Sequence, residues 1–166
     1  APDLLDIYIT FDEVIDIFTS ELFITHGDAT SSSGFTSESN NNIYHLTELI
    51  PGQGLITIDV ESWDLVGNGI LSSKDVVYEQ ILSSQYTEVF SPSRNLMLQF
   101  EEDDIDGNAS ILIQEKDLEI TNEVINTDFQ RVSNIYEISS VDMNILEDVS
   151  VEISIPEQYL DLDYWK

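Results

Sequence analysis

The stretch "LITIDVESWDLVGNG", residues 55–69, decides how this chain folds. Apolar and polar residues alternate through its first half, which is typical of a strand with one buried face. Gly67 and Asn68 follow, and these residue types adopt left-handed backbone angles most readily. Asp64, which stands just before them, can accept backbone N–H groups across a turn. The stretch therefore predicts a strand and then a structural corner that leads into the last strand of a small β-domain.

The same two-residue alternation recurs along the chain, and turn-forming clusters such as "PGQG" and "DDIDGN" separate the runs. Short alternating strands between such clusters are typical of antiparallel sandwiches. We therefore predict an all-β fold of two small antiparallel β-sandwich units, with a first domain over residues 1–74 and a second over 75–166. The alternating runs cover residues 6–11, 21–27, 42–49, 55–61, 95–100, 110–115, 134–139 and 149–155.

Segment 74–86, "KDVVYEQILSSQY", breaks this pattern, because Val77, Ile81 and Leu82 have helical spacing. It lacks the cap and the length of a secure helix, so we interpret it as a boundary segment that can form a short strand. Elsewhere the alternation predicts which side chains face the two cores. In the first unit these are Ile7, Ile9, Phe11, Phe23, Tyr44, Leu46, Ile56, Ile58 and Val60. In the second unit they are Leu96, Leu98, Phe100, Ile111, Ile113, Tyr136, Ile138, Val151, Ile153 and Ile155.

The composition is strongly acidic: among 166 residues, 33 are Asp or Glu and 5 are Lys or Arg, which gives a formal net charge of −28. Such a charge repels nucleic-acid phosphates and anionic membranes, so we expect neither as a partner. It favours a saline or Ca²⁺-rich extracellular setting, although a generic acidic surface without a specific ligand is the alternative. Cysteine is absent, which excludes disulfides and thiolate sites, and no apolar run is long enough to span a membrane.

Residues 5–72 resemble the bacterial immunoglobulin-like domains that occur in tandem in large surface and secreted proteins. The resemblance covers "IYITFDEVIDIFTSELFITHGDA" and "NIYHLTELIPGQGLITIDVESWDLVGNG". Trp63 departs from the family pattern, in which a small residue is commoner. The resemblance implies an immunoglobulin-like sandwich at the cell surface or outside the cell, with neighbouring domains of a longer chain as partners. The matching positions are Phe11, Asp12, Glu13, Phe23, Gly27, Tyr44, Pro51, Ile56, Ile58, Val60, Asp64, Gly67 and Asn68.

Residues 86–156 resemble a β-module of ankyrin-type and zonula-occludens-type proteins and of bacterial surface proteins. The matching stretches are "VFSPSRNLMLQF", "GNASILIQ", "VSNIYEIS" and "VSVEISIP", which follow the order of that module. Some of the glycine and proline markers of the module are missing, at residues 91–94 and 147–149. The resemblance implies a second β-sandwich without catalytic residues.

The acidic stretch "EEDDIDGNAS", residues 101–110, is chemically the most distinctive part of the second half. Its oxygen-bearing side chains stand at alternate positions and Gly107 allows a sharp bend, as in part of a Ca²⁺ loop. A complete loop of that kind needs an acidic residue where Ile113 stands, so a solvated acidic β-turn is the alternative. Together with the carboxylate on the 64–68 turn, the candidate Ca²⁺ ligands are Asp64, Asp104, Asp106 and Asn108.

Motifs that carry catalysis do not occur in the sequence. His26 and His45 have no second histidine at metal-ligand spacing, so we expect surface or partly packed side chains, and no serine-nucleophile or phosphate-loop motif is present. We therefore predict a non-enzymatic extracellular structural or adhesion module, a spacer or scaffold of a large bacterial surface or secreted protein. Ca²⁺ would be its stabilising ion, and a glycan or a surface protein its external partner.

Two other functions fit the same sequence. One is a carbohydrate-binding accessory module of a secreted enzyme, in which exposed aromatic rings stack on sugars; Tyr159, Tyr164 and Trp165 are the clustered candidates. The other is a polymerising surface subunit that donates residues 1–11 as a strand to its neighbour.

Overall fold

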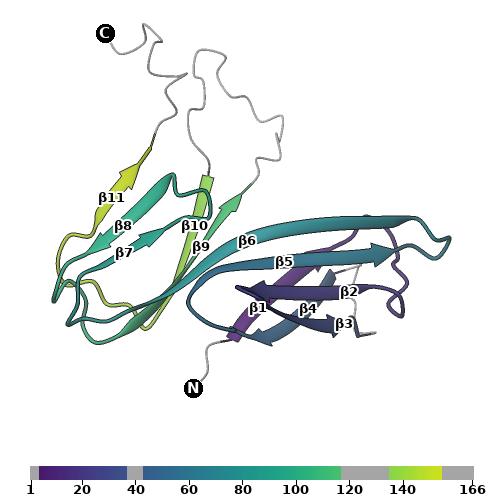
Figure 1. The fold of residues 1–166 in the computed structure, drawn as a ribbon, viewed down its shortest axis with the longest axis horizontal. Coiled ribbons are helices and arrows are strands. Elements are labelled where there is room, and N and C mark those ends of the chain that lie inside the picture. Colours follow the sequence, from purple (N-terminus) through teal and green to yellow (C-terminus); the bar gives the residue numbers. More distant parts are fainter. Residues whose placement is uncertain (1–3, 37–42, 117–134, 155–166) are drawn as a thin grey trace, which may run out of the picture. The chain divides into compact units, whose positions relative to one another are not determined.

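The computed structural model describes residues 4–36, 43–116 and 135–154, and all regular structure in these ranges is antiparallel β (Figure 1). The all-β antiparallel class predicted from the sequence is confirmed. The chain divides into two compact units, Ala1–Asp75 and Val76–Lys166. The sequence places this boundary one residue earlier, after residue 74. The boundary falls inside strand β6 (Gly69–Ile81), which contributes its first residues to unit 1 and its last residues to unit 2.

Unit 1 contains two antiparallel sheets. In the first, β1 pairs with β4, with Ile7 opposite Leu46. In the second, β5 lies between β2 and the start of β6, and β3 lies at the edge beside β2. The strands are β1 (Leu4–Thr10), β2 (Glu21–His26), β3 (Ala29–Gly34), β4 (Ile43–Leu49) and β5 (Gly54–Trp63).

The core of unit 1 follows the predicted alternation on β5, where Ile56, Ile58 and Val60 are buried. The prediction for β2 is wrong by one residue, because Leu22 and Ile24 are buried while Phe23 is only half-buried. The register explains the difference: Leu22 lies opposite Val60 and Ile24 opposite Ile58, so these pairs share the inward face. Three further expected core positions, Ile9, Phe11 and Leu46, are half-buried rather than buried.

Aromatic rings close one part of this core. Phe11, Phe35 and Tyr44 pack edge to face, with ring centroids 5.3 to 6.0 Å apart. Phe35 and Tyr44 are buried, and such edge-to-face pairs add to the stabilisation from burial alone. The same aromatic cluster therefore joins the β1–β4 sheet to the segment that follows β3.

Unit 2 contains the three-stranded antiparallel sheet β11-β8-β7 and the β10-β9-β6 part of a six-stranded sheet of order β10-β9-β6-β5-β2-β3, whose other strands belong to unit 1. The inward residues of both sheets form one hydrophobic cluster, as in a sandwich. The strands added here are β7 (Thr87–Phe90), β8 (Leu96–Phe100), β9 (Ala109–Lys116), β10 (Ile135–Val141) and β11 (Ser150–Ile153). The cluster contains Val77, Ile81, Val89, Leu96, Leu98, Phe100, Ile105, Ala109, Ile111 and Ile113.

The core prediction for the outer strands of unit 2 is wrong. Ile138 on β10 and both Val151 and Ile153 on β11 are exposed, and Tyr136 is half-buried. Each of these two strands pairs on one side only within the described part of the chain, so its side chains lack neighbours on the other side. Ile155 lies outside the described residues.

Within the 74–86 segment, residues 74–81 form the end of β6 and not a helix, and residues 82–86 form the turn before β7. Val76 to Ile81 pair with Ala109 to Gln114 on β9. Val76, Val77 and Tyr78 are all buried, so both faces of the strand are covered at this point. Period-two alternation disappears in a strand that is covered on both faces, which is why the spacing resembled that of a helix. The immunoglobulin-like topology expected for unit 1 stays a prediction.

Candidate functional site

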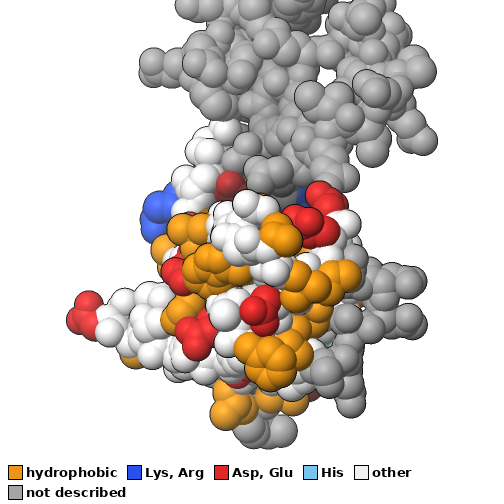
Figure 2. Space-filling view, turned by 90° about the vertical axis from the view of Figure 1, so that its right-hand side faces the viewer, with side chains coloured by type: hydrophobic (Ala, Val, Ile, Leu, Met, Phe, Trp, Pro, Cys, Tyr) orange, Lys and Arg blue, Asp and Glu red, His pale blue; other side chains and the backbone are white. Residues whose placement is uncertain are grey.

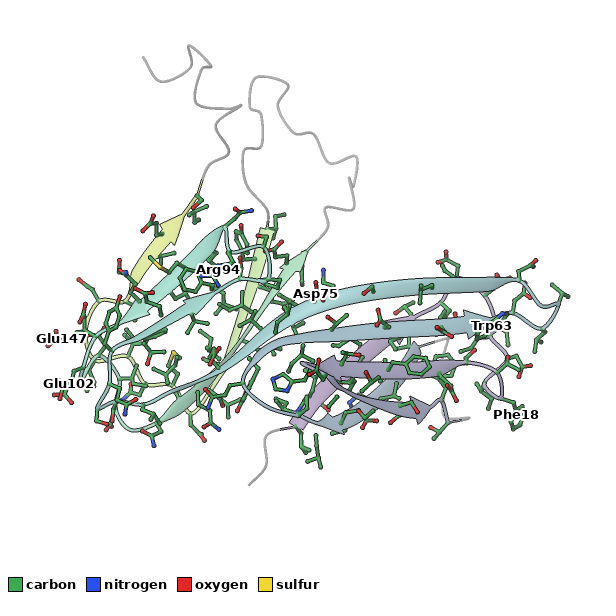
Figure 3. The ribbon with its side chains drawn as sticks, viewed as in Figure 1. Phe18, Trp63, Asp75, Arg94, Glu102 and Glu147 are labelled. Carbon is green, nitrogen blue, oxygen red and sulfur yellow. The ribbon has the colours of Figure 1, made fainter. Side chains whose placement is uncertain are left out.

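Two connections of unit 1 are joined to each other. They are the loop between β1 and β2 and the turn between β5 and β6. The backbone N–H of Asp16 donates to the carbonyl of Trp63 at 2.7 Å, next to an isolated β-bridge between Ile15 and Asp64. The backbone N–H of Trp63 donates in turn to Oγ of Ser20 at 3.2 Å. Because Ile15 and Ser20 are buried, this junction is anchored in the core, and Figure 3 shows Phe18 and Trp63 at this end of the unit.

The loop side of the junction is a turn held by Asp16. Its Oδ1 accepts the backbone N–H of Phe18 at 3.0 Å. Its carbonyl oxygen accepts the backbone N–H of Thr19 at 3.2 Å and the hydroxyl of Ser20 at 2.8 Å. An aspartate that accepts the N–H two residues later is a recurrent turn former. The turn directs Phe18 outward, and that residue is 92% exposed.

The hairpin side of the junction is the structural corner that the sequence predicts. Oδ1 of Asp64 accepts the backbone N–H groups of Val66 at 2.9 Å and Asn68 at 2.8 Å. Its Oδ2 accepts the Asn68 side-chain amide at 2.6 Å, and Gly67 has a φ of 91°. These bonds, the Asn68 side chain first, hold the pKa of the Asp64 carboxyl below its ordinary value. The interpretation of "DLVGN" as a corner is confirmed.

Both turns present apolar side chains to solvent. We call the exposed apolar side chains of these two connections, Val14, Phe18, Leu65 and Val66, the apolar tip. Leu65 is 71% exposed and Val66 83% exposed, although hydrogen bonds fix the backbone on both sides of them. Figure 2 looks at the end of unit 1 where Phe18 lies and shows hydrophobic side chains gathered with acidic ones between them. Exposed apolar side chains that gather in one place mark interaction surfaces more often than scattered ones do.

An open pocket of about 580 Å³ lies beside the tip. Half-buried Trp63 offers an apolar indole face there, and the carboxylates of Asp16 and Asp64 stand near it. Since both carboxylates accept hydrogen bonds from their own turns, they also fix the shape of the pocket. The lining residues are Asp16, Thr19, Trp63, Asp64, Leu65, Val66 and Gly67.

The predicted Ca²⁺ ligands of unit 2 lie on a different loop and serve mainly as turn-forming groups. Asp104 is 4% exposed, and its Oδ2 accepts the backbone N–H of Glu101 at 2.7 Å. The carbonyl oxygen of Asp104 accepts the backbone N–H of Leu146 at 2.7 Å, and the backbone N–H of Asp106 donates to the carbonyl of Asn144 at 2.9 Å. Asp106 is exposed, as is Asn108.

No three His, Cys, Asp or Glu side chains in the described ranges lie close enough together to hold a metal ion. Asp64 and the 104–108 group belong to separate loops of separate units, and Asp104 turns its carboxylate toward the Glu101 backbone. The residues present therefore fit a buried turn better than a Ca²⁺ ligand set. The Ca²⁺ prediction itself stays a prediction.

The two histidines are surface or partly packed side chains, as expected from the sequence. Nε2 of His26 lies 2.7 Å from the carbonyl oxygen of Gln53. Nε2 of His45 lies 2.9 Å from Oδ1 of Asp6, and its ring stacks on Tyr8 with centroids 4.4 Å apart. The bond from His45 holds the pKa of the Asp6 carboxyl below its ordinary value. Both histidines thus support local structure at strand ends and on the β1–β4 sheet.

Comparison of the chain with protein-family models, with curated proteins and with solved structures finds no match. The described residues contain no helix long and apolar enough to cross a membrane. The sequence predicts the corner at Asp64 but neither the outward Phe18 nor the joining of the two connections. The one signal available was "DIFTS", in which Asp16 precedes Phe18 by two residues, the spacing of an aspartate-held turn.

Proposed function

We propose that the chain is a non-enzymatic structural and adhesion module of a larger bacterial surface or secreted protein, and that it makes contact through the apolar tip. The single observation that carries the proposal is the exposure of Phe18, Leu65 and Val66 on turns that hydrogen bonds hold in place. Leaving such side chains in water forgoes about 1.5–3 kcal/mol of burial for each. A partner that covers them would recover that free energy.

The polar groups of the site support a structural role over a chemical one. Asp16 and Asp64 use their carboxylates to close turns, and Ser20 uses its hydroxyl to join the two connections. An extracellular setting agrees with the net charge of −28, because salt or Ca²⁺ relieves its self-repulsion. In this proposal the acidic units serve as a spacer, and the tip gives the contact.

The test compares two leucines of unit 1 that are similarly exposed. Leu65 belongs to the tip, whereas Leu49, 60% exposed, lies at the end of β4 opposite Leu4. Beads coated with wild type, Leu65→Ser or Leu49→Ser protein are assayed for retention on immobilised extracellular matrix proteins and on a glycan array. We expect Leu65→Ser to reduce retention about tenfold, as a loss of roughly 1.4 kcal/mol requires, and Leu49→Ser to leave it unchanged. Equal loss from both variants, or no retention of wild type on any surface, would contradict the proposal.

The second candidate function is carbohydrate binding, and the pocket at Trp63 is the observation that favours it. A half-buried indole beside carboxylates is a combination that can stack on a sugar ring and bind its hydroxyls. Tyr159, Tyr164 and Trp165 lie outside the described residues. Retention on glycans alone, lost in Trp63→Ala but kept in Leu65→Ser, would select this function over protein adhesion.

A further inference from the structure

Strand β11 of unit 2 has apolar side chains on its inner face that remain open to solvent. Val151 lies opposite Leu98 and Ile153 opposite Leu96, and both partners are buried in the core. Residues directly opposite each other share a face, so Val151 and Ile153 also point to the core side of the sheet. Nevertheless they are 57% and 46% exposed. Within residues 4–36, 43–116 and 135–154, the core is thus incomplete along this edge.

Among the described strands, the backbone edge of β11 that faces away from β8 has no neighbour. Ser154 N–H donates to the carbonyl of Asn95 at 2.8 Å, so the even-numbered residues of the strand face β8. In an antiparallel pair the residues between them direct their N–H and C=O groups away from the neighbour, which here means Val151 and Ile153. The carbonyl of Leu96 agrees with this, since it accepts the N–H of Ser91 rather than that of Ile153. Within the described ranges β11 has β8 as its one neighbour.

Most described charged side chains around this edge are acidic, and Arg94, which lies over the Phe90 ring beside β8, is the exception. Glu152 lies between the two apolar residues, on the opposite face of the strand, and is exposed. Glu147 and Asp148 precede β11, and Glu101 and Glu102 directly follow its neighbour β8. A second copy of the chain, with its own net charge of −28, would place like charges against this edge and be repelled. A strand with Lys or Arg between apolar residues matches both features.

We infer that the edge of β11 that has no neighbouring strand among the described residues is an acceptor for an extended segment of a partner protein in which apolar residues alternate with basic ones. The segment adds as a strand beside β11, with its apolar side chains next to Val151 and Ile153 and a basic side chain beside Glu152. Backbone hydrogen bonds to residues 151 and 153 give affinity, and the apolar–basic alternation gives specificity. This site is separate from the apolar tip of unit 1 and does not depend on the function proposed for it.

The experiment uses the whole chain and three synthetic peptides. In the first peptide isoleucine alternates with lysine, in the second the same residues are scrambled, and in the third isoleucine alternates with glutamate. Fluorescence anisotropy gives each Kd, and hydrogen exchange followed by NMR gives the protection of each amide. We expect the alternating lysine peptide to bind about tenfold more tightly than the scrambled one, and to slow exchange of the Val151 and Ile153 amides.

Two variants separate strand addition from simple charge attraction. Ile153→Pro removes an N–H that points away from β8, so the β8–β11 ladder is retained while the acceptor edge is blocked. Ile153→Pro should weaken the binding of the alternating lysine peptide about tenfold, whereas Leu65→Ser in unit 1 should leave the binding of this peptide unchanged. Glu152→Lys should exchange the preference, so that the glutamate peptide binds better than the lysine peptide. This second variant keeps the test decisive if Ile153→Pro disturbs folding.

Three results would overturn the inference. Equal binding of the alternating and scrambled peptides would reduce it to charge attraction. Protection of the Val151 and Ile153 amides in the free chain would mean that the edge is already covered. An unchanged peptide preference in Glu152→Lys would mean that the peptide binds elsewhere.

Discussion

Replacing Asp104 by alanine should destabilise unit 2 whether or not Ca²⁺ is present. The carboxylate is buried, and it accepts the backbone N–H of Glu101 at 2.7 Å, which closes the turn after β8. The same residue accepts Leu146 N–H through its carbonyl, next to the isolated bridge between Ile105 and Ile145. Asp104 thus links the turn after β8 to the segment between β10 and β11.

Two effects of this substitution oppose each other. Loss of a hydrogen bond to a charged group costs about 1.5–3 kcal/mol. Removing one of five acids among residues 101–106 relieves repulsion, but the other four side chains are exposed, so added salt screens this repulsion and leaves the buried hydrogen bond intact. The hydrogen bond therefore dominates, and we expect a net loss of about 2 kcal/mol, or about 10 °C in the melting transition of a unit this size.

Differential scanning calorimetry of the whole chain, in Ca²⁺ and in EDTA, measures this loss. Glu102→Ala is the matched control, because Glu102 belongs to the same acidic run but is exposed (Figure 3). It should change the free energy of unfolding by less than about 0.5 kcal/mol. The reasoning is refuted if the two variants behave alike, since only charge would then matter. It is also refuted if Asp104→Ala loses stability in Ca²⁺ alone, since the carboxylate would then act as a metal ligand.

Other predictions concern unit 1 and the charge of the chain. Phe18→Ser should leave the free energy of unfolding within about 0.5 kcal/mol of wild type in urea denaturation, whereas Leu22→Ala, in the core, should lose about 2–5 kcal/mol; similar losses would mean that Phe18 is covered. The lowered pKa of Asp64 means that its carboxylate stabilises the fold fully above the unfolded value of 3.8, and that this contribution is lost as the pH falls through the lowered folded value. The stability gap between wild type and Asp64→Ala should therefore be constant near neutral pH and shrink below pH 3.8; a gap that does not depend on pH would contradict the assigned hydrogen bonds. Gly69→Ala would place a Cβ 2.7 Å from Nε1 of Trp63, so the indole N–H resonance of Trp63 should move in NMR spectra, and an unchanged resonance would contradict that packing. Added NaCl should raise the melting temperature by screening the charge of −28, and a larger gain from Ca²⁺ at matched ionic strength would indicate specific sites.

The sequence predicts well those features that depend on nearby residues. Alternation on β5 placed Ile56, Ile58 and Val60 in the core, and the "DLVGN" stretch predicted the turn at Asp64. Both follow from local rules, because a half-buried strand alternates and an aspartate–glycine turn closes on itself.

Features that depend on distant partners were not predictable from the sequence in the same way. Phe23 and Leu22 are both apolar, and only the pairing of Leu22 with Val60 decides which one is inside. Val151 and Ile153 alternate as core residues do, yet the described strands leave their edge open. The apolar tip requires two connections, 11–20 and 64–68, to meet through the Trp63 backbone. A local sequence pattern does not predict a contact between two connections that lie far apart in the chain.

The position of the unit boundary within β6 decides how the protein can be dissected. A fragment that begins at Gly69 brings into unit 2 residues that the intact chain already exposes, Ile70 and Leu71 among them, together with half-buried Lys74. A fragment of unit 1 that continues to Ile81 would instead uncover Val76 and Tyr78, which the intact chain buries, and would invite aggregation. The two units therefore differ as fragments. A unit 2 fragment can keep all of β6, whereas a unit 1 fragment has to end before the buried apolar residues of that strand.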